Sequence, residues 1–373
     1  MKKIGIITFH NVQNAGAMLQ AFALKKYLET KGYEVYFIDY IQKKLLERNA
    51  IYRNPFRRAI SNYRHNKNPI TFLKIVIHGI ITNMFFLRRL SVQKIFDEFR
   101  QKNFKIMALE LIASTHFYAL IAGSDQIWNS NLIGGSLDPI YFLSFSDINA
   151  LKISYAASAG GLLSEKDLLV LPDLLKNLDY ISVREKELAE QISPFTDKPV
   201  YTVLDPTLLL KKEEWLPLIN KKFTHDPYIF LYVLEENRLL YKTVEYLSKK
   251  YKLKIVELGF KKRTSSTLVK HYDPFDFLSI IQNADYIVTN SFHGAVFSIV
   301  FEKQFIIIPH STRNTRLENL LKSVDLLDRV IHEDSNLDML GDISHFSEIK
   351  NKLNVLKESS ENYLKMSLKH DKD

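Results

Sequence analysis

The sequence predicts an α/β protein with two domains in tandem, each built around a mainly parallel sheet. Short apolar runs alternate with segments of helical spacing along most of the 373 residues, which is typical of parallel sheets covered by helices. This alternation starts again near residue 226, after a polar stretch. The chain is also long for one hydrophobic core and sufficient for two. We therefore expect two domains with a cleft between them.

The first half of the chain begins with a predicted strand–helix–strand unit. Residues 4–9 and 35–38 are its strands, and the helix between them ends at Gly32. Further strands are predicted at residues 118–122, 153–157, 180–183 and 200–204. These elements form the predicted N-terminal domain, residues 1–210.

The second half repeats the pattern. Strands are predicted at residues 228–233, 254–258, 286–288 and 305–308, with helices at Arg238–Tyr251 and Pro274–Asn283. The predicted C-terminal domain covers residues 211–345. A charged C-terminal helix is expected at residues 346–373.

Residues 41–110 interrupt the α/β pattern and carry the basic charge. They hold 15 Lys/Arg against 4 Asp/Glu, a local charge of +11, so the rest of a chain with net charge +9 carries −2. The apolar part, residues 69–87, includes Lys74, His78 and Asn83 and is too polar for a transmembrane helix. We expect a helical insertion whose basic face is either solvated or rests on an anionic membrane surface as a platform. The segment has no recognised nucleic-acid-binding motif, so that partner is not expected.

The composition limits the chemistry that the chain can perform. The chain has no cysteine, which excludes disulfides, thiolate metal sites and cysteine nucleophiles. It also has no zinc-site spacing, GxGxxG fingerprint or Walker motif. The apolar run at residues 4–9 is too short for a signal peptide, so the expected location is cytoplasmic.

The stretch around His293 is the most informative candidate site. Asn290 and Ser291 form a polar turn between a predicted strand and helix, and ligands of open α/β sheets bind at such turns. The helix N-terminus, which includes Ser291 and Gly294, offers N–H groups to an anion. His293 is either a hydrogen-bonded structural group or a group that transfers protons.

Two other turns carry groups suited to an anion. Asn14 and Gly16 follow the first strand, where Gly16 either admits a ligand close to the backbone or only shapes the turn. Arg184 ends a strand and either binds a carboxylate or phosphate or pairs with Glu185 or Glu187.

Two more polar segments follow predicted strands. Arg313 and Arg316 either complete an anion site or belong to a solvated basic turn. Asp125, Gln126 and Trp128 have the polar groups and the aromatic ring of a sugar site. The alternative is a capped turn with a core tryptophan.

Taken together, several segments resemble the polysaccharide pyruvyl transferase family. The resemblance runs in order from residue 3 to about residue 322, apart from the basic segment. It is carried by residues 6–11, 14–20, 122–129, 154–158, 181–185, 203–209 and 290–294.

The resemblance implies two Rossmann-like domains around a cleft, similar to the GT-B fold of glycosyltransferases. It implies a pyruvyl transferase that moves pyruvate from phosphoenolpyruvate onto a hydroxyl pair of one sugar, forming a ketal and releasing phosphate. The acceptor would be a polysaccharide or lipid-linked oligosaccharide of exopolysaccharide, capsule or cell-envelope biosynthesis. Phosphoenolpyruvate is a co-substrate, and no metal or organic cofactor is required. The expected location is cytoplasmic, including the inner face of the cytoplasmic membrane.

The resemblance also assigns roles to the candidate residues. His293 is the predicted catalytic residue. The predicted donor-binding residues are Arg184, Asn14, Gly16, Ser291, Gly294, Arg313 and Arg316. Asp125, Gln126 and Trp128 are predicted either to bind the acceptor or to hold the cleft. Two alternative functions are a GT-B-type glycosyltransferase that uses a nucleotide sugar and a non-catalytic glycan-binding protein.

Overall fold

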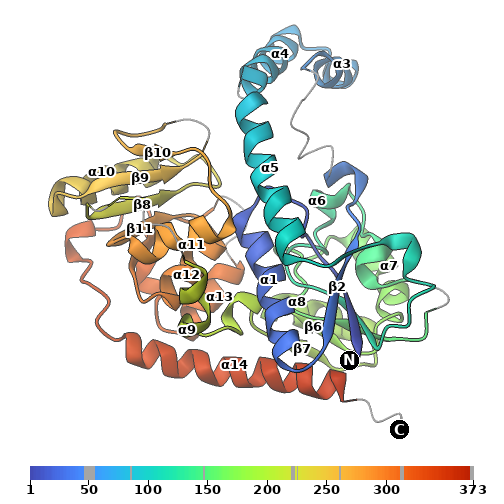
Figure 1. Cartoon of the computed structure of the whole chain (residues 1–373). Helices are drawn as coiled ribbons and strands as arrows, with labels where there is room; N and C mark the ends of the chain where they lie inside the picture. The colour runs from blue at the N-terminus through green and yellow to red at the C-terminus, as the bar shows by residue number, and fades with distance from the viewer. Residues whose placement is uncertain are drawn as a thin grey trace.

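Two five-stranded parallel sheets form the framework of the protein, as a computed structural model shows (Figure 1). The model describes residues 1–45, 55–84, 86–145, 148–219, 223–224, 226–259, 262–310 and 315–369. The predicted fold class, two Rossmann-like domains with a basic helical insertion, is confirmed.

The first sheet has the strand order β3-β2-β1-β4-β5, and all its pairs are parallel. Its strands are β1 (Lys3–Ile7), β2 (Glu34–Asp39), β3 (Ile106–Ala108), β4 (Ala119–Ala122) and β5 (Leu151–Ser154). A short parallel pair, β6 (Ile181–Val183) and β7 (Val200–Thr202), continues beyond β5 through isolated bridges. The helices of this half are α1 (Ala15–Thr30), α6 (Ser130–Ile133), α7 (Glu165–Leu175) and α8 (Lys186–Ile192).

The second sheet has the equivalent order, β10-β9-β8-β11-β12. Its strands are β8 (Tyr228–Tyr232), β9 (Lys254–Leu258), β10 (Thr267–Val269), β11 (Tyr286–Thr289) and β12 (Gln304–Ile307). The helices are α9 (Lys212–Trp215), α10 (Arg238–Tyr251), α11 (Pro274–Asn283), α12 (Phe292–Val300) and α13 (Thr315–Ser323). In both sheets the first strand lies in the centre, which is the order of a Rossmann half.

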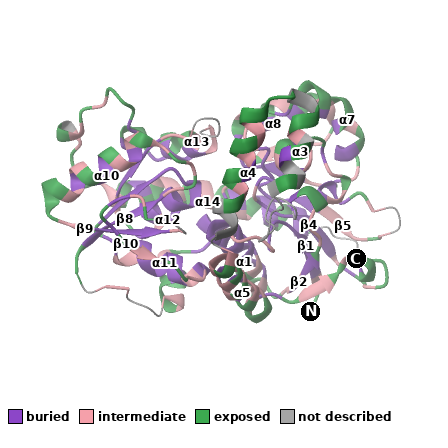
Figure 2. Ribbon diagram, turned by 90° about the horizontal axis from the view of Figure 1, so that it is seen from above, coloured by how far each residue is buried: buried purple, intermediate pink, exposed green. Residues whose placement is uncertain are grey.

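The central strands are buried on both faces because helices cover both sides of each sheet. Every residue of β4, β8 and β11 is buried. Figure 2 labels β4 and β8 among the buried strands. This burial explains why these strands are continuous apolar runs in the sequence. The two strands that were not predicted, β3 and β10, have three residues each, lie at sheet edges and are only partly buried.

The basic insertion is helical, but it is shorter than residues 41–110. Its helices are α3 (Pro55–Asn66), α4 (Pro69–Met84) and α5 (Phe86–Asn103). The predicted segment also contained β3, which belongs to the first sheet. Figure 1 shows α3 and α4 standing away from the body of the molecule, while α5 returns to it.

Aromatic side chains join the two domains into one core. Phe22 of α1 lies 5.2 Å from Phe275 of α11 and 6.1 Å from Trp215, measured between ring centroids. Trp215 in turn lies 5.1 Å from Phe297 of α12. Burying such rings on both sides of the boundary stabilises one arrangement of the domains.

The last helix, α14 (Phe346–Leu368), leaves the second domain and packs on the first. The Tyr363 hydroxyl donates to the Ser154 carbonyl at 2.8 Å, and the Leu204 N–H donates to the Ser360 hydroxyl at 2.9 Å. This helix therefore bridges the two domains along one side (Figure 1).

A buried histidine follows β1. The ring of His10 is fully buried between Phe37 and Phe104, and its Nδ1 lies 2.9 Å from the Thr8 carbonyl oxygen. The pKa of His10 is lowered to about 4, because burial and the charge of Arg100 lower it more than the Thr8 carbonyl and Asp39 raise it.

We predict that His10 makes the protein less stable in acid. Between about pH 6.5 and pH 4 the unfolded chain binds a proton that the folded protein does not, so the free energy of unfolding falls as pH falls. The expected loss is about 3 kcal/mol over this range. Denaturant titrations followed by circular dichroism from pH 8 to pH 4.5 measure it. His10→Gln should flatten the profile, whereas His116→Gln, at an exposed position, should not.

Candidate functional site

The turn between β11 and α12 is held by its own polar side chains. The Thr289 hydroxyl donates to the Tyr232 carbonyl at 2.7 Å and accepts from the Ser291 N–H at 3.0 Å. The Ser291 hydroxyl caps α12 by accepting from the Gly294 N–H at 3.2 Å. A Cβ at Gly294 would lie 2.9 Å from Thr289. Ser291 and Gly294 thus shape the turn that presents His293, and donor binding by them stays a prediction.

His293 lies on the boundary between the domains, against Gly16. A Cβ at Gly16 would lie 2.2 Å from Nδ1 of His293, which is closer than side-chain atoms can approach. Asn14 caps α1 by accepting from the Ala17 N–H at 3.2 Å, so its side chain fixes the same turn. The absence of a side chain at Gly16 makes room for the imidazole of the other domain.

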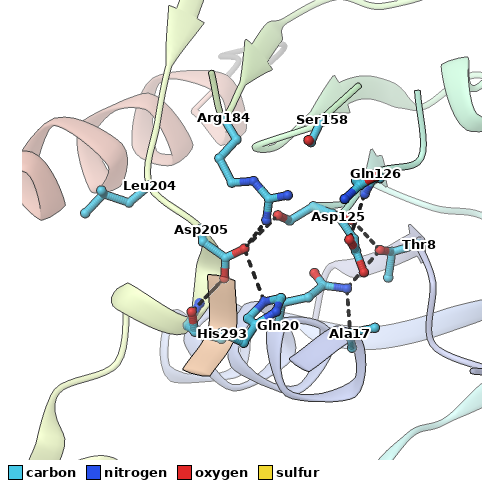
Figure 3. Close-up of polar contacts among 12 residues, drawn as sticks. Thr8, Ala17, Gln20, Asp125, Gln126, Ser158, Arg184, Leu204, Asp205 and His293 are labelled. Atoms are coloured by element: carbon cyan, nitrogen blue, oxygen red, sulfur yellow. Dashed lines mark hydrogen bonds and ion pairs between the residues drawn. The ribbon is translucent and has the colours of Figure 1, made fainter. Parts of the chain in front are cut away.

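The buried carboxylate of Asp205 joins the candidate residues of both domains (Figure 3). Its Oδ2 lies 2.5 Å from Nη1 of Arg184 and 3.6 Å from Nε2 of His293, and it accepts from the Ser124 hydroxyl at 3.3 Å. Its Oδ1 accepts from the hydroxyl and N–H of Thr207 at 2.6 and 3.0 Å. Asp205 therefore fixes the positions of an arginine and a histidine from opposite sides of the cleft.

The charge of Asp205 is stabilised although the side chain has no exposure. Burial alone raises the pKa of a carboxyl, but the contacts with His293, Arg184 and Thr207 outweigh it and hold the pKa of Asp205 well below its usual range. The site therefore contains a permanent negative charge beside the imidazole of His293.

The side chains of Arg184 and Arg316 both lie near the ring of Phe292. Their guanidinium carbons lie 4.8 and 5.2 Å from its centroid. The pKa of Arg316 is lowered to about 10, because burial and the charge of Arg184 lower it more than the nearby carboxylates raise it. Among the described residues, no group hydrogen-bonds to Nε or Nη2 of Arg184 or to Nε of Arg316. Two crowded cations with uncommitted donors favour binding of an anion.

Glu185 balances part of this positive charge. It is buried, it accepts from the Ser158 hydroxyl at 2.5 Å, and it lies 3.9 Å from Nε of Arg184. Burial raises the pKa of Glu185, while Arg184 and the Ser158 hydroxyl oppose that rise. Arg184 thus has the predicted ion pair with Glu185 only at long range, and its close partner is Asp205.

A cavity of about 510 Å³ opens beside these arginines. Its lining includes Arg184, Asp205, Phe292 and Arg316, with further residues of α8, α13, α14 and the segment 202–208. The volume lies in the range of small-molecule sites. His293 does not line it, but Asp205, 3.6 Å from the imidazole, does.

The predicted acceptor residues have different surroundings. Asp125 has a positive φ of 79° and accepts from the Gln126 N–H at 2.8 Å, as a turn residue does. The side-chain amide of Gln126 is satisfied when its oxygen faces Arg316 and accepts from Nη2 and Nη1 at 2.9 and 3.0 Å. Gln126 therefore supports the arginine pair.

The predicted acceptor role of Trp128 is wrong. Its side chain has no exposed surface, its ring stacks on Phe142 with centroids 4.5 Å apart, and Nε1 donates to the Tyr141 carbonyl at 3.0 Å. A sugar has no access to such a ring. The core tryptophan of the alternative interpretation is confirmed. Arg313 lies outside the described residues.

Comparison with known proteins identifies the family. The model of the family "Polysaccharide pyruvyl transferase" matches residues 14–312, most of the chain. The chain belongs to this family. Membership makes it a transferase of polysaccharide biosynthesis. No curated protein sequence matches the chain.

Solved structures agree on the fold. A UDP-N-acetylglucosamine 2-epimerase is similar with a TM-score of 0.53 at 9% identity, covering 99% of this chain and 96% of its own. The UDP-GlcNAc 2-epimerase of Neisseria meningitidis bound to UDP-GlcNAc gives 0.47 at 10% identity, with 98% and 94% covered. The glycosyltransferase SsfS6 of Streptomyces sp. SF2575, complexed with thymidine diphosphate, gives 0.41 at 10% identity, with 98% and 99% covered. The first of these likenesses, with a TM-score above 0.5, supports the two-domain GT-B-like architecture.

Sequence reasoning assigned no role to Asp205, Phe292 or Ser158. Asp205 was part of a segment used for the family resemblance, and a carboxylate directly after the apolar pair Val203 and Leu204 was the available signal. The partners of these residues are distant in the chain, so their functions depend on contacts that spacing does not reveal.

We predict that Gly16→Ala displaces the imidazole of His293. The added methyl group overlaps Nδ1, so the domains must separate slightly or the ring must rotate, at a cost of about 1–3 kcal/mol. Thermal denaturation measures this loss. Gly161→Ala is the matched control, because nothing lies within 4 Å of its Cβ position. Equal melting temperatures for both variants would contradict the close contact.

Proposed function

We propose that this transferase moves the pyruvyl group of phosphoenolpyruvate onto two hydroxyls of one sugar and releases phosphate. The observation that carries the proposal is the buried cluster of Asp205, Arg184 and His293, which combines anion-binding donors with a proton-transfer group at the boundary of the domains. Family membership supplies the transferase class, and the cluster supports the donor and the chemistry.

The donor is a small trianion, and the arginine pair suits it. Arg184 and Arg316 present buried donors without hydrogen-bond partners among the described residues. A phosphate or carboxylate placed there offsets the repulsion between the two guanidinium groups. The contact of Asp205 with Nη1 leaves Nη2 and Nε of Arg184 for the ligand.

The reaction requires one proton to be delivered to C3 and two protons to be removed from the sugar hydroxyls. Protonation of C3 of the enol makes C2 electrophilic, one sugar hydroxyl adds to C2, the C2–O bond to phosphate breaks, and the second hydroxyl adds. One hydroxyl proton replaces, on the group that acts as acid, the proton that it delivered to C3. The other hydroxyl proton leaves with phosphate. His293 beside the charged Asp205 suits the role of acid and then base.

We predict acceptor-dependent phosphate release from phosphoenolpyruvate. Incubation with a panel of glycans and lipid-linked oligosaccharides should give a product heavier by one pyruvyl ketal, as mass spectrometry detects. His293→Gln should lower kcat by about 100-fold or more, because proton transfer of this kind contributes about 10²–10⁴-fold. His116→Gln, at an exposed position, should keep full activity.

Two results would contradict this proposal. One is the absence of phosphate release with every acceptor of the panel. The other is stabilisation of the protein by nucleotide diphosphates and not by phosphoenolpyruvate in thermal denaturation, which would favour a nucleotide-sugar glycosyltransferase.

We predict a graded effect at Arg184. Arg184→Lys keeps the charge but loses the fork of donors, so KM for phosphoenolpyruvate should rise by about tenfold or more, with a smaller change in kcat. Arg184→Gln leaves Asp205 without its buried counter-ion and should be worse in both activity and melting temperature. Steady-state kinetics with varied donor separate the two parameters. An unchanged KM for phosphoenolpyruvate in the Arg184→Lys variant would argue against donor binding by Arg184.

A further inference from the structure

The projecting helices α3 and α4 expose an unusual number of large apolar side chains. Ile70, Leu73, Ile77 and Ile80 of α4 are between 47% and 65% exposed. Their spacing of three, four and three residues places them on one face of the helix. On α3, Phe56, Ile60 and Tyr63 are also exposed and share one face by the same spacing. Soluble proteins rarely expose continuous apolar strips without a binding function.

The charge of this region selects an anionic partner. Residues 48–96 contain ten Lys/Arg and no Asp or Glu. Arg64 and Lys67 lie beside the turn between the helices, and Lys74 lies beside the apolar face of α4; all three are exposed. Apolar side chains flanked by Lys and Arg are typical of helices that lie in the surface of an anionic bilayer.

The helices are built to lie on a bilayer and not to cross it. Among the described residues, no helix is long and apolar enough to span a membrane. The 16 residues of α4 and the 12 of α3 correspond to about 24 and 18 Å, shorter than the hydrocarbon core.

The insertion also projects from the edge of the first sheet at which ligands of such folds bind. It follows the carboxyl end of β2, on the edge from which the turns after β1 and β4 carry Gly16 and Asp125. At the base of the projection, Nη2 of Arg88 donates to the Gly259 carbonyl at 2.6 Å, directly after the carboxyl end of β9. The projecting helices are therefore anchored to the ligand-binding edges of both sheets.

We propose that α3 and α4 dock on an anionic phospholipid bilayer, with the α4 face of Ile70, Leu73, Ile77 and Ile80 inserted among the lipids. The bound orientation brings the ligand-binding edge of the sheets toward the membrane surface. If the proposed transfer reaction holds, this orientation favours an acceptor glycan attached to a membrane lipid.

Binding to vesicles tests the docking without any donor, acceptor or turnover. The full chain should co-sediment with vesicles of phosphatidylcholine and phosphatidylglycerol mixed in about equal parts, less with phosphatidylcholine alone, and less at high salt. Leu73→Asp/Ile77→Asp should lower the partition coefficient by about tenfold or more. Leu169→Asp/Val170→Asp is the matched control, since it adds the same charges at exposed apolar positions of α7.

Three outcomes would overturn the proposal. They are no co-sedimentation of the wild-type chain with anionic vesicles, equal binding of both double variants, and equal binding to neutral and anionic vesicles. Sedimentation velocity without lipid adds a fourth: self-association that Leu73→Asp/Ile77→Asp abolishes would make a second copy of the chain the occupant of this face. Failure here leaves the transferase assay unaffected, because soluble acceptors do not need the membrane.

Discussion

The buried carboxylate of Asp205 is the interaction on which the site depends. Arg184 belongs to the first domain and His293 to the second, and Asp205 contacts both. A buried charge is tolerated only when it is paired and hydrogen-bonded, and Asp205 meets this condition through Arg184, Ser124 and Thr207. Loss of one partner leaves the other charge uncompensated, so the three side chains act as one unit.

This unit requires a fixed distance between the two domains, and the packing around the unit maintains that distance. The contacts of Phe22 with Phe275 and Trp215 continue the hydrophobic core across the boundary. Gly16 permits an approach that any other residue prevents, and α14 bridges the domains on one side. Rigid packing therefore sets the spacing between the two arginines and the imidazole, as the proposed reaction requires of groups that act by positioning.

The sequence predicted the fold better than it predicted the roles of individual residues. Strands such as β4 and β8 are apolar throughout because both faces are buried, so their continuous apolar runs identified them. Edge strands β3 and β10 have no such signal. Residue roles depend on contacts that spacing does not reveal. Trp128, which the sequence assigned to a sugar site, is a core side chain. Asp205, which had no predicted role, is the centre of the site.

The topology of parallel sheets explains why site and insertion share one edge. Turns at the carboxyl ends of strands are free to vary because they do not disturb the strand order, so binding residues and insertions both accumulate there. Gly16, Asp125 and the His293 turn follow strands at this edge, and the helices α3–α5 follow β2 at the same edge. A surface that docks the protein through these helices therefore faces the edge that carries these turns. A projection from the opposite edge, with the same apolar face, would point these turns away from the surface it binds.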